Sequence, residues 1–258
     1  MMKFLKDLFH YFLLLRFSWK YINIKIISSY FGSGITGFYS QMGQDSFIYS
    51  EFYHQIRKSG FPKTFLDIGC NHPVKFSNSL FFEEMLNFKV IGVDPLPGYV
   101  EDWKRLRPSA AIHSLALGNE NSEMRLQVPD TASMHDTGSH PIDMFSTLDK
   151  ENNLLKNGKW AELTVPVKRT QDFLDEIKVS EIGVMSIDVE GFEMNVLRGL
   201  DFAKTKVYIA IIENNSKSRF GSDDIRKYMS QNGFSFYARF WGLDDVYVNN
   251  TLKNINEH

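Results

Sequence analysis

Three carboxylates follow two apolar segments of the chain, in a pattern that suits proton transfer or metal binding. Asp188 and Glu190 come directly after Gly183–Ile187, and Glu213 follows Val207–Ile212. If these segments are neighbouring parallel strands, their carboxyl ends meet at one edge of a sheet. Asp188 or Glu190 could then take the proton of a reacting hydroxyl. The three carboxylates could also hold Mg²⁺ or Mn²⁺, which prefer oxygen ligands, but we do not favour a metal.

A second group of residues lies nearer the N-terminus and suits a nucleoside. Thr64–Ile68 has the length and β-enrichment of a buried strand, and Gly69 after it allows a sharp turn. Asp94 directly follows the next predicted strand, Lys89–Val93. An acid in that place can accept hydrogen bonds from both hydroxyls of a ribose. The pattern predicts the first two strands of a nucleotide-type α/β fold with a nucleoside-bearing cofactor.

The glycine pattern narrows the choice of cofactor. A dinucleotide needs a GxGxxG run so that the backbone can approach a pyrophosphate, and Gly69–Val74 has only the first glycine. S-adenosylmethionine carries no phosphate, and its ammonium and sulfonium groups suit an acid at the end of the first strand, where Asp67 lies. We therefore expect S-adenosylmethionine rather than a dinucleotide.

Length and composition exclude several classes of protein. With 258 residues, 43% hydrophobic and 23% charged, the chain can bury one large core. The net charge of −2 gives no electrostatic reason to bind nucleic acid. Cys70 is the only cysteine, so the chain can form no internal disulfide and no cysteine metal cluster. This cysteine usage fits a reducing compartment, and we expect a cytoplasmic protein.

The first 39 residues predict a basic, amphipathic, helical extension. Residues 1–31 carry five basic residues and one acid, a net charge of +4. Within residues 1–31 the longest uncharged stretch, Leu8–Leu15, has 8 residues, and a membrane-spanning helix needs roughly 20. Residues 1–31 could lie on an anionic membrane surface as a peripheral contact. The alternative is a helix that covers the core or a partner subunit.

The rest of the chain, residues 40–258, alternates helical and strand patterns, as in a parallel sheet covered on both faces. Further predicted strands are Ala110–Leu115, Gly183–Ile187 and Val207–Ile212, and predicted helices are Ser40–Gly60, Ser77–Asn87, Tyr99–Leu106, Gln171–Lys178 and one capped by Ser222. Two final strands, Phe234–Phe240 and Asp245–Asn249, are joined by a short link that predicts a hairpin. This layout predicts a class I methyltransferase (Rossmann-like) fold. We expect a mainly parallel seven-stranded sheet that ends in an antiparallel hairpin.

The α/β alternation breaks between Met124 and Arg169. Two strand-like segments, Arg125–Val128 and Glu162–Lys168, flank a long polar stretch. A loop of that length inside a compact domain is uncommon unless it binds something or closes a site. Residues 129–159 are therefore our candidate lid or acceptor loop. The alternative is that they form a connection without a functional role.

The chain resembles the FkbM-type S-adenosylmethionine-dependent methyltransferases over about residues 40–215. The matching pieces are Ser40-Gln41 with Gly43-Gln44-Asp45, Phe65–Gly69, Ser77–Ser79, Val93–Pro97, Ser186–Glu193 and Val196–Gly199. Relatives usually have alanine, asparagine and a further glycine where this chain has Cys70–Pro73, and many have Glu-Pro where it has Asp94-Pro95. The resemblance implies methyl transfer to a hydroxyl of a sugar or other alcohol, often in the assembly of surface polysaccharides or natural products.

Pattern and resemblance together give three sets of candidate residues. The catalytic candidates are Asp188, Glu190 and His72. The cofactor-binding candidates are Asp67, Gly69, Asn71, Asp94, Ser114 and Asp188. The acceptor-binding candidates are Ser77, Asn78, His135, Glu213 and Asn214. Families that methylate amino groups carry Asn/Asp-Pro-Pro-aromatic after the fourth strand, where this chain has Asp188–Gly191, and this difference favours oxygen as the accepting atom.

These observations predict an O-methyltransferase that acts on a sugar hydroxyl. The expected acceptor is a surface glycan or polysaccharide, or its sugar-nucleotide or lipid-linked precursor. One alternative is a methyltransferase for a small natural product or a lipid. An alternative of another class is a non-catalytic module that binds the cofactor or a membrane within a glycan assembly complex.

Overall fold

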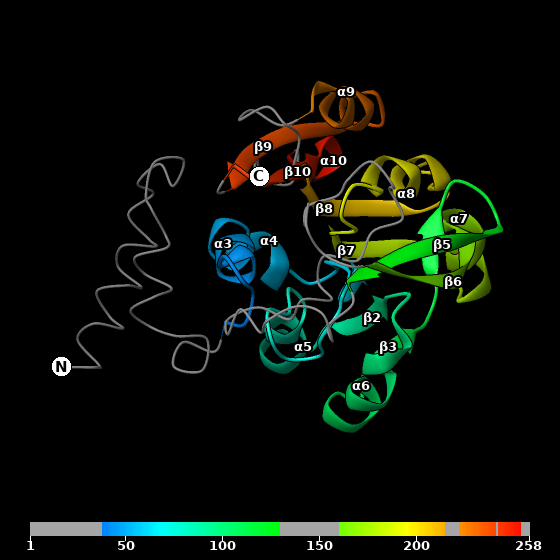
Figure 1. Cartoon of the computed structure of the whole chain (residues 1–258). Helices are drawn as coiled ribbons and strands as arrows, with labels where there is room; N and C mark the ends of the chain where they lie inside the picture. The colour runs from blue at the N-terminus through cyan, green and yellow to red at the C-terminus, as the bar shows by residue number, and fades with distance from the viewer. Residues whose placement is uncertain (1–37, 130–159, 215–221, 241, 254–258) are drawn as a thin grey trace.

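The computed structural model describes residues 38–129, 160–214, 222–240 and 242–253 (Figure 1). Residues 1–37 of the predicted N-terminal extension and residues 130–159 of the candidate lid loop, which include His135, lie outside these residues. None of the helices in the described part is both long enough and apolar enough to cross a membrane.

A seven-stranded sheet forms the centre of the described structure (Figure 1). In spatial order its strands are β3 (Ala111–His113), β2 (Lys89–Val93), β1 (Thr64–Ile68), β7 (Glu181–Ile187), β8 (Lys206–Glu213), β10 (Asp244–Asn249) and β9 (Phe234–Phe240). The pairs from β3 to β8 are parallel, which confirms the predicted mainly parallel sheet. β10 is antiparallel to both β8 and β9.

A second, three-stranded sheet explains the break in the α/β alternation. It consists of β4 (Ala116–Gly118), β6 (Trp160–Arg169) and β5 (Ser122–Pro129) in that spatial order. The predicted third strand, Ala110–Leu115, is shorter than expected. The Leu115 N–H bonds back to the His113 carbonyl at 3.2 Å, so the chain turns there from β3 into β4 of the second sheet.

Helices cover both faces of the large sheet. One apolar layer gathers residues of α3 (Gln44–Glu51), α4 (Tyr53–Arg57), α5 (Leu80–Leu86), α6 (Val100–Leu106) and α10 (Asn250–Lys253). The opposite layer gathers residues of α7 (Thr170–Glu176), α8 (Glu193–Gly199) and α9 (Asp223–Gln231). A short 3₁₀ helix, η2 (Pro97–Tyr99), precedes α6. The sheet is therefore buried on both sides, and its polar ligand groups must lie at the strand ends.

Candidate active site

The pleat of the strands places their terminal acids on one face of the sheet. In β1, Phe65 packs in the layer of α3–α6, whereas Leu66 and Ile68 pack in the opposite layer. Successive side chains of a strand alternate, so Asp67 shares the face of Phe65. In β8, Ile211 packs in the α3–α6 layer, and Glu213 shares its face in the same way.

Gly69 brings the ends of β1 and β7 into direct contact. Its φ is +81°, a left-handed conformation that glycine adopts without strain. A Cβ atom at this position would lie 1.7 Å from the carbonyl oxygen of Asp188. The Asp188 N–H also donates to the Ile68 carbonyl at 3.0 Å. Position 69 therefore has no room for any side chain.

Asp94 organises the loop after β1 from the end of β2. Its Oδ2 accepts the Asn71 N–H at 2.9 Å, and its Oδ1 accepts the Leu96 N–H at 2.9 Å. Asn71 has a φ of 42°, and its carbonyl accepts the indole N–H of Trp103 at 2.7 Å. The Asp94 carboxylate is thus fixed at the rim of the site, where it lines the larger of the hollows described next.

Two adjoining hollows open at the carboxyl ends of β1, β2 and β7. The larger encloses about 680 Å³, part of it open to solvent, and is lined by Ile68, Gly69, Asn71, Val93, Asp94, Pro95, Leu96, Leu115, Ala116, Leu117, Leu126, Asp188, Val189, Glu190 and Phe192. The smaller encloses about 410 Å³ and is lined by Gln41, Gln44, Asp67, Gly69, Cys70, Asn71, Lys75, Phe76, Asn78 and Asp188. Gly69, Asn71 and Asp188 line both hollows, so one extended ligand could reach from one into the other.

Hydrogen-bond acceptors without donors face the smaller hollow. Asp67 is 2% exposed, and its Oδ2 has no partner among the described residues. Asn78 donates from Nδ2 to the Ser186 hydroxyl at 3.1 Å, but its Oδ1 likewise lacks a partner in the described part of the chain. Burial raises the pKa of Asp67, although Ser79 and the charge of Arg107 oppose this. Buried acceptors of this kind call for a ligand that brings N–H donors.

Arg107 supports Asp67 from behind. It is 2% exposed and donates to Glu83 Oε2 at 2.6 Å, to the Ser77 hydroxyl at 3.1 Å and to the Ser79 hydroxyl at 3.0 Å. Its guanidinium also lies over the Trp103 ring, 4.2 Å from the centroid. This network fixes the segment between β1 and α5, and it accounts for the buried hydroxyls that precede α5.

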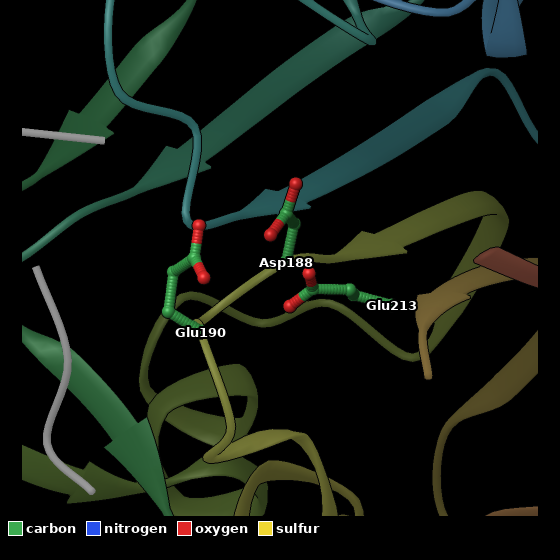
Figure 2. A group of neighbouring side chains, drawn as sticks. All are labelled: Asp188, Glu190 and Glu213. Carbon is green, nitrogen blue, oxygen red and sulfur yellow. The ribbon is translucent and has the colours of Figure 1, made fainter. Parts of the chain in front are cut away.

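Asp188, Glu190 and Glu213 point toward one another at the ends of β7 and β8 (Figure 2). One oxygen from each carboxylate can be chosen so that all three lie within 4.8 Å of one another. The chain is no longer extended here, because Glu190 has a φ of +53° and Gly191 a φ of +103°. Glu193, at the start of α8, closes this turn by accepting the N–H groups of Val189 at 3.2 Å and Gly191 at 2.9 Å.

Burial and mutual repulsion raise the pKa values of these acids. Burial and the charge of Glu190 raise the pKa of Asp188 well above its ordinary value. Burial and the charge of Asp188 do the same to the pKa of Glu213. Burial, with the charge of Glu193, raises the pKa of Glu190 to about 7. Half-buried carboxylates that face one another need a proton or a cation to balance their charges.

Two predicted site residues serve the loops rather than the hollows. His72 is not among the described residues that line either hollow. Its Nδ1 accepts the N–H groups of Val74 at 3.1 Å and Lys75 at 2.9 Å, which stabilises the loop. Ser77 accepts from Arg107 and from the Leu80 N–H at 3.2 Å, and it is absent from the described lining too.

Two others, Asn214 and Ser114, are also absent from the described lining of both hollows. Asn214 uses both amide protons, donating to the Ser222 carbonyl at 3.1 Å and to Asp245 Oδ2 at 2.8 Å. Ser114 is exposed in the turn after β3, and the three residues after it line the larger hollow instead. Glu213 lies with Asp188 and Glu190 in the group of three acids. The other predicted residues that line one or both hollows are Asp67, Gly69, Asn71, Asn78, Asp94, Asp188 and Glu190.

The structure adds three residues that sequence reasoning missed: Glu193, Gln44 and Asp244. Glu193 is the second acid of the segment that resembles FkbM proteins, and Gln44 belongs to the Gly43–Asp45 piece, so both carried a signal. Asp244 carried none. It lies in β10 directly opposite Glu213 of β8, and burial raises its pKa to about 6, although a hydrogen bond from Gln44 and the charge of Arg239 oppose the shift.

The mixed α/β fold and its mainly parallel seven-stranded sheet are consistent with a Rossmann-like methyltransferase. The family model described as "Methyltransferase FkbM domain" matches residues 67–236. The chain belongs to this FkbM methyltransferase family, as its sequence predicts.

One curated relative resembles part of the chain. It is the protein named "Methyltransferase 1" of Beauveria bassiana (strain ARSEF 2860), 32% identical over 95 residues, which cover 34% of this chain and 37% of that protein. The match therefore spans little more than a third of that relative's length. No solved structure matches the chain at a significant level.

Proposed function

We propose that this protein is an S-adenosylmethionine-dependent O-methyltransferase that methylates a sugar hydroxyl. Its acceptor would be a surface glycan or polysaccharide, or a sugar-nucleotide or lipid-linked precursor. The observation that carries the proposal is the pair of hollows that share Gly69, Asn71 and Asp188. One hollow is mainly apolar and the other is polar and acidic, as a nucleoside joined to a charged amino acid requires.

The residues present fit this methyl donor. Apolar walls that include Leu96 and Leu117, with Asp94 at the rim, suit an adenine and the two hydroxyls of a ribose. The unpartnered Oδ2 of Asp67 suits an ammonium group. Asp188 lies where the two hollows join and supplies negative charge for a sulfonium. The positive charge of a sulfonium bound beside Asp188 would also favour the ionised form of this carboxylate, which a base requires.

In this proposal Asp188 and Glu190 take the proton of the acceptor. When bound, S-adenosylmethionine supplies a methyl group on a positively charged sulfur. The sulfur keeps the electron pair of the broken carbon–sulfur bond as the new carbon–oxygen bond forms. Asp188 orients the acceptor hydroxyl and receives its proton at a carboxylate oxygen, with Glu190 in support. A base with a pKa near the operating pH is the most effective, and the pKa of Glu190 is about 7. Alignment of the two reactants contributes on the order of 7 to 11 kcal/mol where it is good.

The carboxylates of Asp188, Glu190 and Glu213 also fit a divalent cation. Their oxygens are the ligand type of Mg²⁺ and Mn²⁺, and such an ion would acidify a bound hydroxyl. We favour direct proton transfer. Turnover that stops on chelation and returns with Mg²⁺ or Mn²⁺ would favour the metal instead.

The acid-rich lining supports a hydroxyl-bearing acceptor, because carboxylates accept hydrogen bonds and hydroxyls donate them. We also propose that residues 1–31, with their net charge of +4, make a peripheral contact with an anionic membrane, where lipid-linked sugars lie. Residues 129–159 would contribute acceptor contacts.

Titration calorimetry of the full chain tests the donor. We expect S-adenosylmethionine to bind and NAD, which carries a pyrophosphate, not to bind. A chain that fails to bind S-adenosylmethionine would contradict the proposal. Mass spectrometry of the host's surface glycans, with and without the protein, tests the acceptor through the loss of one CH₂ mass increment. Donor binding with unchanged glycans would point to a natural product or lipid acceptor, and binding without transfer to any acceptor would point to a non-catalytic module.

A further inference from the structure

Gln44 and Asp244 meet beside the smaller hollow from opposite ends of the described chain. Gln44 begins α3 and Asp244 begins β10, and both lie outside the segment that matches the family model. The Gln44 Nε2 donates to Asp244 Oδ2 at 2.9 Å. Each residue is 7% exposed, and Gln44 lines the smaller hollow. The pair joins two segments that are 200 residues apart in sequence, and its place beside the hollow suggests a role there.

The side chain of Gln44 is held in one orientation. Its Oε1 accepts the Met42 N–H at 3.0 Å while its Nε2 donates to Asp244. Asp45, which is fully buried, anchors the same segment by accepting the N–H groups of Tyr39 at 2.6 Å and Ser46 at 2.8 Å. A polar group fixed in this way binds a ligand without first losing rotamer freedom.

The remaining N–H of Gln44 complements the other groups of the hollow. A primary amide has two N–H donors, and the second one of Gln44 has no partner among the described residues. The unpartnered atoms of Asp67 and Asn78 in the same hollow are both acceptors. Lys75 also lines this hollow and adds an ammonium group. The hollow therefore offers acceptors for an ammonium and donors for a carboxylate, the two charged groups of an α-amino acid.

We propose that Gln44 binds the carboxylate at the amino-acid end of the methyl donor, and that Asp244 is the positioning residue that aims its amide. This inference rests on the proposed function, because it assumes S-adenosylmethionine as the donor. It assigns a binding role to the Gly43–Asp45 segment and to the start of the C-terminal strand β10. Both would then be parts of the donor site rather than supports of the sheet edge.

Calorimetry with two donors that differ only in the carboxylate tests this assignment. S-adenosylmethionine and decarboxylated S-adenosylmethionine carry the same sulfonium and ammonium charges. For Gln44→Ala we expect about tenfold weaker binding of S-adenosylmethionine, the effect of one hydrogen bond to a charged group, and an unchanged affinity for the decarboxylated compound. Gln127→Ala is the matched control, because that amide also donates to a carboxylate, of Glu162 at 3.0 Å, and Gln127 is not among the described residues that line either hollow.

Variants of Asp244 test the positioning role. Asp244→Asn keeps an oxygen that can accept from Gln44, so we expect nearly wild-type affinity for S-adenosylmethionine. Asp244→Ala should weaken the binding of S-adenosylmethionine as much as Gln44→Ala does. The double variant should lose no more affinity than either single variant, since the two substitutions remove the same interaction. Asp244→Asn removes the same charge as Asp244→Ala, so the difference between these two variants reports the loss of the acceptor that aims Gln44.

Three results would overturn the inference. Gln44→Ala could leave S-adenosylmethionine binding unchanged, or weaken both donors equally, which would mark a purely structural role. The wild type could bind both donors with the same affinity, in which case the carboxylate is not recognised although the proposed function stands. Failure of the wild type to bind either donor would instead remove the proposed function, and this inference with it.

Discussion

The carboxylates at the two halves of the strand-end rim are held in opposite ways. At the ends of β1 and β2, Asp94 accepts two backbone N–H groups and Asp67 has Ser79 and Arg107 beside it. At the ends of β7 and β8, Asp188, Glu190 and Glu213 mainly face other acids, whose charges add to burial in raising their pKa values, whereas Arg107 opposes the effect of burial on the pKa of Asp67. The first half is suited to holding a ligand in fixed geometry, and the second half is suited to receiving a proton or a positive charge.

The second half is arranged at a cost in stability. Like charges directly opposite each other on paired strands are unfavourable, and Glu213 faces Asp244 across β8 and β10. Glu193 adds a further buried acid, 6% exposed, at the start of α8. Such unfavourable groupings persist in proteins where function requires them. If the comparison is correct, substitutions in the first half should change donor affinity, and substitutions in the second half should change turnover and pH dependence.

The largest expected effect is that of Asp188→Asn. The amide keeps the size of the side chain but cannot accept the hydroxyl proton, so we expect turnover to fall by about 10² to 10⁴. Affinity for S-adenosylmethionine should change much less. Transfer of labelled methyl to the host's glycan fraction measures turnover, and calorimetry measures affinity. The matched control is Asp172→Asn, which alters a half-exposed carboxylate on α7. Near-normal turnover of Asp188→Asn would show that another group is the base.

The next effect is that of Asp94→Ala on donor binding. Loss of the carboxylate removes the proposed ribose contacts and frees the N–H groups of Asn71 and Leu96, so we expect about 10- to 100-fold weaker binding of S-adenosylmethionine. Asp102→Ala, at a more exposed carboxylate on α6, is the control. Unchanged affinity in a folded Asp94 variant would remove the ribose assignment and, with it, the distinction between the two halves.

The sequence predicts the sheet and the acids at its edge for a clear physical reason. Strands buried on both faces are continuous apolar runs, so the predicted Lys89–Val93 coincides with β2, and Thr64–Ile68 coincides with β1. Each run ends where the first polar residues appear, which places Asp94, Asp188 and Glu213 at the rim without knowledge of tertiary contacts.

The direction of a polar side chain depends on partners far away in sequence, so it could not be predicted. Asn214 follows β8 as expected, yet it turns to Asp245, 31 residues further on. His72 lies in the predicted loop, yet its ring accepts local backbone N–H groups. Asp244 belongs to the site only because β10 pairs with β8, and an acid at the end of a hairpin link carries no sign of such pairing.

The smallest expected effect is on stability, and it distinguishes the two halves without any assay of turnover. The pKa of Glu190 is raised from its ordinary 4.5 to about 7, so the folded state binds more protons than the unfolded state between these values. The free energy of unfolding should therefore fall as the pH rises from about 5 to about 8. In Glu190→Gln the fall should be smaller by on the order of 1 to 2 kcal/mol, since the glutamine does not titrate.

Urea unfolding followed by circular dichroism at several pH values measures this difference. Part of the fall should remain in Glu190→Gln, because burial also raises the pKa values of Asp188 and Glu213. Glu123→Gln, at an exposed position of β5, is the matched control for replacing a glutamate by glutamine elsewhere in the fold. The proposed contrast would be wrong if Glu190→Gln lost stability with pH as steeply as the wild type does. In that case Glu190 would already be ionised in the folded protein, and the repulsion proposed among the acids of β7 and β8 would be absent.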